Sequence, residues 1–208
     1  MSRIGSRIGS RIGSSTGIVV RPVTPSRWDD LARLFGPNGA YSGCWCMFHR
    51  QTSAEFQAKV GTKNRAKMKS LVERRKSPGI LAYVDGVPAG WVSVAPRGEF
   101  GRIERSPLFK HRDATESSDG MWSITCFFIH RNHRGKGIAS ALVTSAVDFA
   151  RKKGARVVEG YPLDPAHKAK WSSPEAYIGT LDMFLAAGFE EVERRKPLRP
   201  LVRYYLTD

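Results

Sequence analysis

The chain has 208 residues, of which 41% are hydrophobic, so it is long enough for one sizeable core and short for two. No apolar stretch approaches the roughly 18 residues that a membrane helix needs, so no membrane span is expected. Three cysteines do not make a disulfide framework and indicate a reducing compartment, the cytoplasm. The net charge of +15 leaves a nucleic acid or an acidic substrate open as partner, although a solvated basic surface explains it equally well.

The start of the chain repeats Ser-Arg-Ile-Gly, with copies beginning at Ser2, Ser6 and Ser10. A four-residue period fits none of the solenoid repeats, and so few copies cannot bury a core. The Arg and Ser content resembles an organellar transit peptide, but Gly at every fourth position would break the helix that such peptides form. We therefore expect residues 1–16 to be a disordered tail and residues 17–208 to form one domain.

In the first half of the domain, capping and turn residues separate the helical from the extended segments. Ser26 is a plausible N-cap, Gly61 interrupts a helical pattern, and Asp85-Gly86 between apolar runs is typical of a two-residue hairpin turn. Beyond the hairpin, Pro, Gly and charges follow without periodicity, which predicts a loop. We expect a strand at 18–23, helices at 26–35 and 54–75, strands at 80–84 and 87–95, and a long loop at 96–120.

The segment 41–49 between the two expected helices is unusually rich in aromatic and sulfur side chains. Cys44 and Cys46 together with His49 suggest zinc, and the missing ligands would come from Cys126, His130 or His133. Neither a second Cys pair nor a His-x3–5-His spacing is present, so we predict no metal site. A plain buried loop and a pocket wall both remain open.

The most specific feature is Arg-Gly-Lys-Gly-Ile-Ala at 134–139, which joins an apolar run at 121–129 to a helical pattern from about 140 to 153. A strand that leads through a glycine turn into a helix presents unpaired backbone N–H groups at the positive end of the helix dipole. Such a point binds anions. The glycines admit a phosphate close to the backbone, and Arg134 and Lys136 add positive charge. The expected ligand carries a diphosphate.

Three nucleotide motifs compete for this turn, and their spacing separates them. A Walker A loop fails because position 130 is His and Lys136 is followed by Gly137. A dinucleotide fingerprint is approximated by Gly135-x-Gly137-x-x-Ser140, but the chain lacks the βαβ alternation that should precede it. The third motif, Arg/Gln-x-x-Gly-x-Gly/Ala, is satisfied in full.

With this motif the chain resembles the GNAT superfamily of acyl-CoA-dependent N-acetyltransferases. The resemblance includes a strand at 127–129, the helix after the motif, a strand at 155–160, and a segment at 183–189 that looks like the family's final helix entering its sixth strand. It spans about 18 to 206. It implies a single α/β domain with a mixed, mostly antiparallel central sheet flanked by helices, and acetyl-CoA as cosubstrate.

The resemblance also implies which residues bind. A main-chain N–H on the strand before the motif would polarise the thioester carbonyl. In GNAT proteins, the segment that corresponds to the aromatic segment 41–49 forms one wall of the acceptor pocket. Cys44, Trp45 and Met47 are therefore expected to contact the acceptor. The cosubstrate would be held by Phe127, Phe128, Ile129, Arg134, Gly135, Lys136, Gly137, Ile138 and Ala139.

The expected catalytic groups depart from the family pattern. Some members place a glutamate base where this chain has Ser123, and many place a tyrosine acid where it has Phe184. Substitutes near the ends of the two adjacent strands are Glu159, Tyr161 and Tyr177. We predict that Tyr177 supplies the hydroxyl near the sulfur, from a loop that precedes a helix capped by Thr180.

Our first hypothesis is therefore an N-acetyltransferase that transfers an acetyl group to a primary amine of a small-molecule or amino-acid-like acceptor by direct attack. The second is an RNA-directed GNAT protein that acetylates aminoacyl-tRNA, which would bind with a strong salt dependence. The third is a CoA-binding protein without catalysis. Oligomeric state does not follow from the sequence, and a homodimer is compatible with it.

Overall fold

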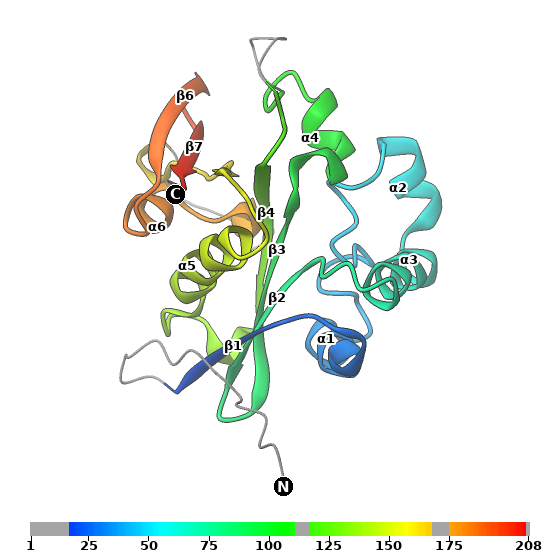
Figure 1. Cartoon of the computed structure of the whole chain (residues 1–208). Coiled ribbons are helices and arrows are strands. Elements are labelled where there is room, and N and C mark those ends of the chain that lie inside the picture. Colours follow the sequence, from blue (N-terminus) through cyan, green and yellow to red (C-terminus); the bar gives the residue numbers. More distant parts are fainter. Residues whose placement is uncertain (1–16, 111–116, 168–174, 207–208) are drawn as a thin grey trace, which may run out of the picture.

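The computed structural model describes residues 17–110, 117–167 and 175–206, and in these ranges the chain forms one seven-stranded sheet (Figure 1). Its order is β1-β2-β3-β4-β5-β7-β6. Only β4 and β5 are parallel, so the predicted mixed, mostly antiparallel sheet is confirmed. The predicted tail at 1–16 lies outside the described residues. The strands are β1 Ile18–Pro22, β2 Gly79–Val84, β3 Val87–Pro96, β4 Met121–Ile129, β5 Val157–Gly160, β6 Glu190–Lys196 and β7 Arg199–Tyr205.

Helices cover both faces of this sheet: α5 and α6 lie on one side, and α1, α2 and α3 lie on the other (Figure 1). The α-helices are α1 Trp28–Phe35, α2 Ser53–Lys59, α3 Thr62–Glu73, α4 Gly101–Arg105, α5 Ile138–Arg151 and α6 Leu181–Leu185. Short 3-10 helices are η1 Pro25–Arg27, η2 Arg97–Glu99, η3 Arg131–His133, η4 Pro165–His167 and η5 Glu175–Ile178.

The two faces of β3 build two separate cores because successive side chains of a strand point to opposite faces. Val92 belongs to the cluster that α5 closes with Leu142 and Ala146. Trp91 belongs to the cluster that α1 and α3 close, and it is fully buried. The central strands therefore read as continuous apolar runs, and each large apolar side chain buried there contributes about 1.5–3 kcal/mol.

Local signals in the sequence produced most of the elements. The helical region 54–75 is interrupted as predicted, because Gly61 adopts φ 82° at the N-cap of α3. A capping box between Thr52 and Glu55 starts α2. The predicted hairpin forms with positive φ at both Asp85 and Gly86, which is the conformation of a type I′ turn.

The predicted loop at 96–120 is wrong in its first part. Residues 97–105 form η2 and α4, and they bury Phe100 and Ile103 completely. The buried Arg97 also belongs to this segment. Two apolar residues in a charged stretch are too few to give a visible period, so only tertiary packing identifies them as core.

β4 changes its pairing along its length, and this change opens the sheet. On one edge β4 pairs with β5 only from Met121 to Ile124. On the other edge it stays paired with β3 up to Ile129. Between Ile124 and Cys126 a register shift leaves Thr125 as the extra residue of a β-bulge. The C-terminal half of β4 therefore has one edge without a strand partner among the described residues.

Candidate active site

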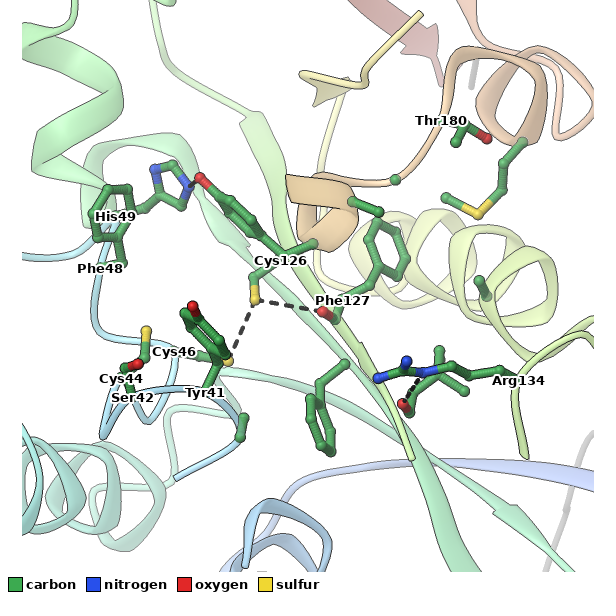
Figure 2. A pocket seen from close by; sticks show the side chains of 18 of the residues that line it. Tyr41, Ser42, Cys44, Cys46, Phe48, His49, Cys126, Phe127, Arg134 and Thr180 are labelled. Atoms are coloured by element: carbon green, nitrogen blue, oxygen red, sulfur yellow. Dashed lines mark hydrogen bonds between the residues drawn. The ribbon is translucent and has the colours of Figure 1, made fainter. Parts of the chain in front are cut away.

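A cavity of about 680 Å³ lies at this opening of the sheet (Figure 2). The loop after α1 forms one wall with Ala40, Tyr41, Ser42, Cys44, Cys46 and Phe48. β4 and the turn after it form a second wall with Cys126, Phe127, Phe128, Ile129, Arg134 and Ala139. The segment around η5 and α6 contributes Ala176, Tyr177, Gly179, Thr180 and Met183. His49 and Phe56 complete the described lining.

The turn before α5 has the geometry that its glycines predict. Gly135 and Gly137 adopt φ values of 72° and 74°, which L side chains rarely tolerate. A Cβ at either position would meet nothing within 4 Å, so the space beside the turn is open. α5 begins with Ile138 and runs for 14 residues, so the positive end of its dipole is at this turn.

The side chains around the turn divide between core and cavity. Ile138 is buried in the core under α5. Arg134 lines the cavity, and its Nε donates to the Ile129 carbonyl at 3.3 Å (Figure 2). Lys136 is exposed. Of the residues predicted to hold the cosubstrate, Phe127, Phe128, Ile129, Arg134 and Ala139 line the cavity.

Tyr177 lies in the cavity and contacts a residue that sequence reasoning had considered only as a zinc ligand. Its hydroxyl is 3.3 Å from Nε2 of His49. Tyr177 precedes the last helix as predicted, since α6 begins at Leu181 after the N-cap Thr180, but it lies in the 3-10 helix η5 and not in a loop. Nδ1 of His49 is buried and has no hydrogen-bond partner in the described ranges.

Both groups are neutral at neutral pH. Burial, and then the positive charges of Arg102 and Arg199, lower the pKa of His49 from its ordinary 6.5 to about 3. Burial, and then the nearby thiol of Cys126, raises the pKa of Tyr177 to about 12. His49 is therefore a weak base, and Tyr177 keeps its proton.

The three cysteines gather at the same cavity, as Figure 2 shows. Sγ of Cys46 is 3.5 Å from Sγ of Cys126. Burial raises the pKa of Cys44 to about 11, and burial followed by the contact with Cys126 raises the pKa of Cys46 well above its usual value. Thiols in this state are poor nucleophiles. In the described part of the chain, no group of three or more His, Cys, Asp or Glu side chains is placed to hold a metal ion.

Two of the predicted acceptor contacts do not reach the cavity. Cys44 lines it, but Trp45 and Met47 are each 4% exposed and pack in the core against α1. Trp45 stacks on Trp28 with ring centroids 6.0 Å apart. The reason is the backbone, because Trp45 and Cys46 have φ values of 48° and 53° and this left-handed turn redirects the side chains. Phe48 and His49 face the cavity instead.

Glu159 and Tyr161 do not line the cavity either. Both are buried in an ionic network in which Arg97 Nη1 is 3.2 Å from a Glu159 oxygen and Arg203 Nε is 2.9 Å from the other. The Tyr161 hydroxyl donates to Glu159 at 2.8 Å. Burial and the Glu159 charge raise the pKa of Tyr161 well above its usual value. Ser123, opposite Glu159 in the parallel register, is 3.0 Å from the Tyr161 hydroxyl, so the place of the missing base belongs to this network.

The described geometry agrees with comparisons to known proteins. Residues 45–169 match the family model described as the acetyltransferase (GNAT) family. The chain belongs to this family. Its resemblance to the GNAT superfamily, its fold class and the enzyme class expected from them are therefore confirmed.

One curated relative of this GNAT protein is the N-acetyltransferase MJ1207 of Methanocaldococcus jannaschii, itself uncharacterized. The two are 27% identical over 125 residues, which is 60% of this chain and 44% of MJ1207. The chain thus spans less than half the length of that relative.

Solved structures share the fold at low sequence identity. YncA from Salmonella typhimurium, solved with its cofactor acetyl-CoA, is 13% identical with a TM-score of 0.54, and the match covers 92% of this chain and 95% of that one. A GCN5-related N-acetyltransferase from Kribbella flavida is 14% identical with a TM-score of 0.53, covering 91% and 98%. PaiA N-acetyltransferase from Thermoplasma acidophilum, in complex with coenzyme A, is 12% identical with a TM-score of 0.51, covering 91% and 99%.

Within the described ranges, every helix is too short or too polar to cross a bilayer.

Proposed function

We propose that this GNAT protein transfers an acetyl group from acetyl-CoA to the primary amine of a small-molecule acceptor by direct attack. The observation that carries the proposal is the continuity of one cavity from Arg134 and Ala139, beside the glycine turn, to the aromatic wall at His49. A diphosphate-bearing cosubstrate and an acceptor could meet in it. We also propose a cytoplasmic location, from the cysteine content alone.

The residues present fit acetyl-CoA at one end of the cavity. The N–H groups at 135–139 lie at the positive end of α5, where the space beside Gly135 and Gly137 is open, and they would bind the diphosphate, assisted by Arg134. The strand edge at 127–129 has backbone groups that no described strand occupies, and these would hold the pantetheine arm and polarise the thioester carbonyl.

The chemistry requires few groups from the protein. A neutral amine attacks the thioester carbon, a C–N bond forms, and the C–S bond breaks with the electron pair leaving on sulfur. The thiolate then accepts a proton, and we assign the donor role to Tyr177 because Phe184 has none to give and Tyr177 is protonated in the cavity. His49 holds that hydroxyl in place.

Steady-state release of CoA with a panel of amines tests the proposal. Saturable release that requires both acetyl-CoA and an amine supports it. Calorimetric binding of acetyl-CoA without release by any amine would favour the non-catalytic alternative. Affinity for tRNA that falls by orders of magnitude between low and moderate salt would favour the RNA-directed alternative, for which the net charge of +15 is the supporting observation.

A further inference from the structure

The acceptor end of the cavity has no negative charge to receive an ammonium group. Among the described residues that line the whole cavity, Arg134 at the cosubstrate end is the single side chain with a formal charge at neutral pH, and no Asp or Glu contributes. The titratable lining groups His49, Tyr177 and Cys44 are all neutral. A cationic acceptor would therefore find no ion-pair partner on these walls.

The charges behind the wall are positive. Phe48 lines the cavity, and Arg102 lies directly behind it. Arg102 Nε donates to the Phe48 carbonyl at 2.7 Å, and the Arg102 guanidinium lies 4.1 Å from the centre of the Phe48 ring. With Arg199 it also depresses the pKa of His49, which shows that both charges act at the acceptor end. Neither arginine forms an ion pair with a carboxylate in the described part of the chain.

Aromatic rings alone do not compensate for this. A cation placed over a ring gains about 0.5–2 kcal/mol. Removing an ammonium from water without an anionic partner costs several kcal/mol. The Phe48 ring already carries one cation, and a second would be repelled by it. The desolvation penalty therefore exceeds the attraction, and the site discriminates against protonated amines.

We propose that the acceptor is a small amine of low basicity, of which a substantial fraction is uncharged at neutral pH, attached to an aromatic or apolar body. This inference rests on the proposed acetyl transfer. The body would pack on the rings of Phe48, Phe56 and Tyr177, where Phe48 meets Phe56 at 5.3 Å and Tyr177 at 6.3 Å between centroids, both nearly perpendicular. An arylamine and the α-amino group of an amino-acid amide share this chemistry.

Such an acceptor also accounts for the missing base. A weakly basic amine arrives with its lone pair free, so no carboxylate is needed to deprotonate it before attack. After the C–N bond forms, the nitrogen is strongly acidic and its proton passes to water, while Tyr177 protonates the sulfur and regains a proton from that water. A carboxylate base is then not required, either at Ser123, which belongs to the buried network, or at His49, which is neutral.

The first test measures CoA release with aniline and phenylalaninamide, which distinguish the two sources of a weakly basic amine. Benzylamine and benzyl alcohol are then added as competitors of whichever is turned over. We expect the inhibition constant of benzylamine to fall about tenfold per pH unit as its ammonium loses a proton, and that of benzyl alcohol to stay constant. Tighter inhibition by protonated benzylamine than by benzyl alcohol would overturn the inference and leave the acetyl transfer intact.

The second test adds the missing charge. Cys44→Asp should tighten inhibition by benzylamine at neutral pH at least tenfold, because the carboxylate would face the cavity, and the matched Cys44→Asn should not. Melting temperature and acetyl-CoA affinity show that both variants fold. An equal effect of both variants would also count against the inference. Absence of CoA release with every amine, with acetyl-CoA binding intact, would overturn the proposed catalysis and the inference with it.

Discussion

The two ends of the cavity are built in different ways. The end at 134–139 is one contiguous turn, formed by two glycines with positive φ and the start of α5, whose backbone N–H groups we propose as the diphosphate site. The end at His49 and Tyr177 joins side chains 128 positions apart in the sequence. A backbone site of this kind can be recognised from six residues, whereas a side-chain site depends on how distant segments pack.

The largest expected effect is on the free energy of unfolding, and it separates two adjacent residues of the segment 41–49. Trp45→Ala should lower the free energy of unfolding by about 3–5 kcal/mol, because its ring is buried against Trp28 and Phe35. Cys44→Ala, next to it but lining the cavity, should lower it by less than about 1 kcal/mol. Denaturant unfolding of both variants measures this difference. Similar losses of unfolding free energy would contradict the placement of Trp45 in the core and Cys44 at the cavity.

The backbone end should respond to a charge at the turn. Gly137→Asp places a carboxylate where the diphosphate is expected and should weaken acetyl-CoA binding by several kcal/mol, on the order of 100-fold or more. Asp tolerates the left-handed backbone there better than most residues. Gly98→Asp is the matched control, since Gly98 is exposed and a Cβ there meets nothing within 4 Å. Unchanged calorimetric affinity in folded Gly137→Asp would contradict the assigned diphosphate site.

The side-chain end should respond to the loss of one hydroxyl. Tyr177→Phe should lower kcat at least tenfold, about 1.4 kcal/mol, with little change in the KM for acetyl-CoA. Tyr161→Phe removes a hydroxyl from the buried network and should lower the melting temperature while kcat stays within about twofold. If Tyr177→Phe keeps kcat within about twofold of wild type, Tyr177 is a packing residue.

The smallest effect near neutral pH is a pH dependence of stability that originates at His49. Its pKa is about 3 in the folded protein and near its ordinary 6.5 in the unfolded chain, so below about 6.5 the unfolded chain takes up the proton and stability falls until pH 3. The loss is about 1.4 kcal/mol at one pH unit below 6.5. In His49→Gln, the free energy of unfolding should depend less steeply on pH between about 3 and 6.5. An identical pH dependence in the variant and the wild type would show that His49 is not buried as described.

Features that depend on neighbours in the chain were predictable. The hairpin at Asp85-Gly86, the break at Gly61 and the turn before α5 all follow from backbone conformations that a few residue types favour, so their signals are local. The family assignment followed from the same kind of signal, because Arg134, Gly137 and Ala139 belong to one short motif that ends a strand and opens a helix.

Features that depend on packing were decided by the tertiary structure. The sequence indicated aromatic and sulfur residues at 41–49, but the left-handed turn at Trp45 and Cys46 determined which of them face the cavity. Glu159 and Tyr161 had suitable chemistry, and their place in the parallel register with β4 put them in a buried network. His49 became a partner of Tyr177 only because η5 packs beside the loop after α1. The sequence by itself determined the family and the glycine turn before α5, since both depend on adjacent residues. The side chains that meet the acceptor were determined by folding, because burial and register act between segments that the sequence does not connect.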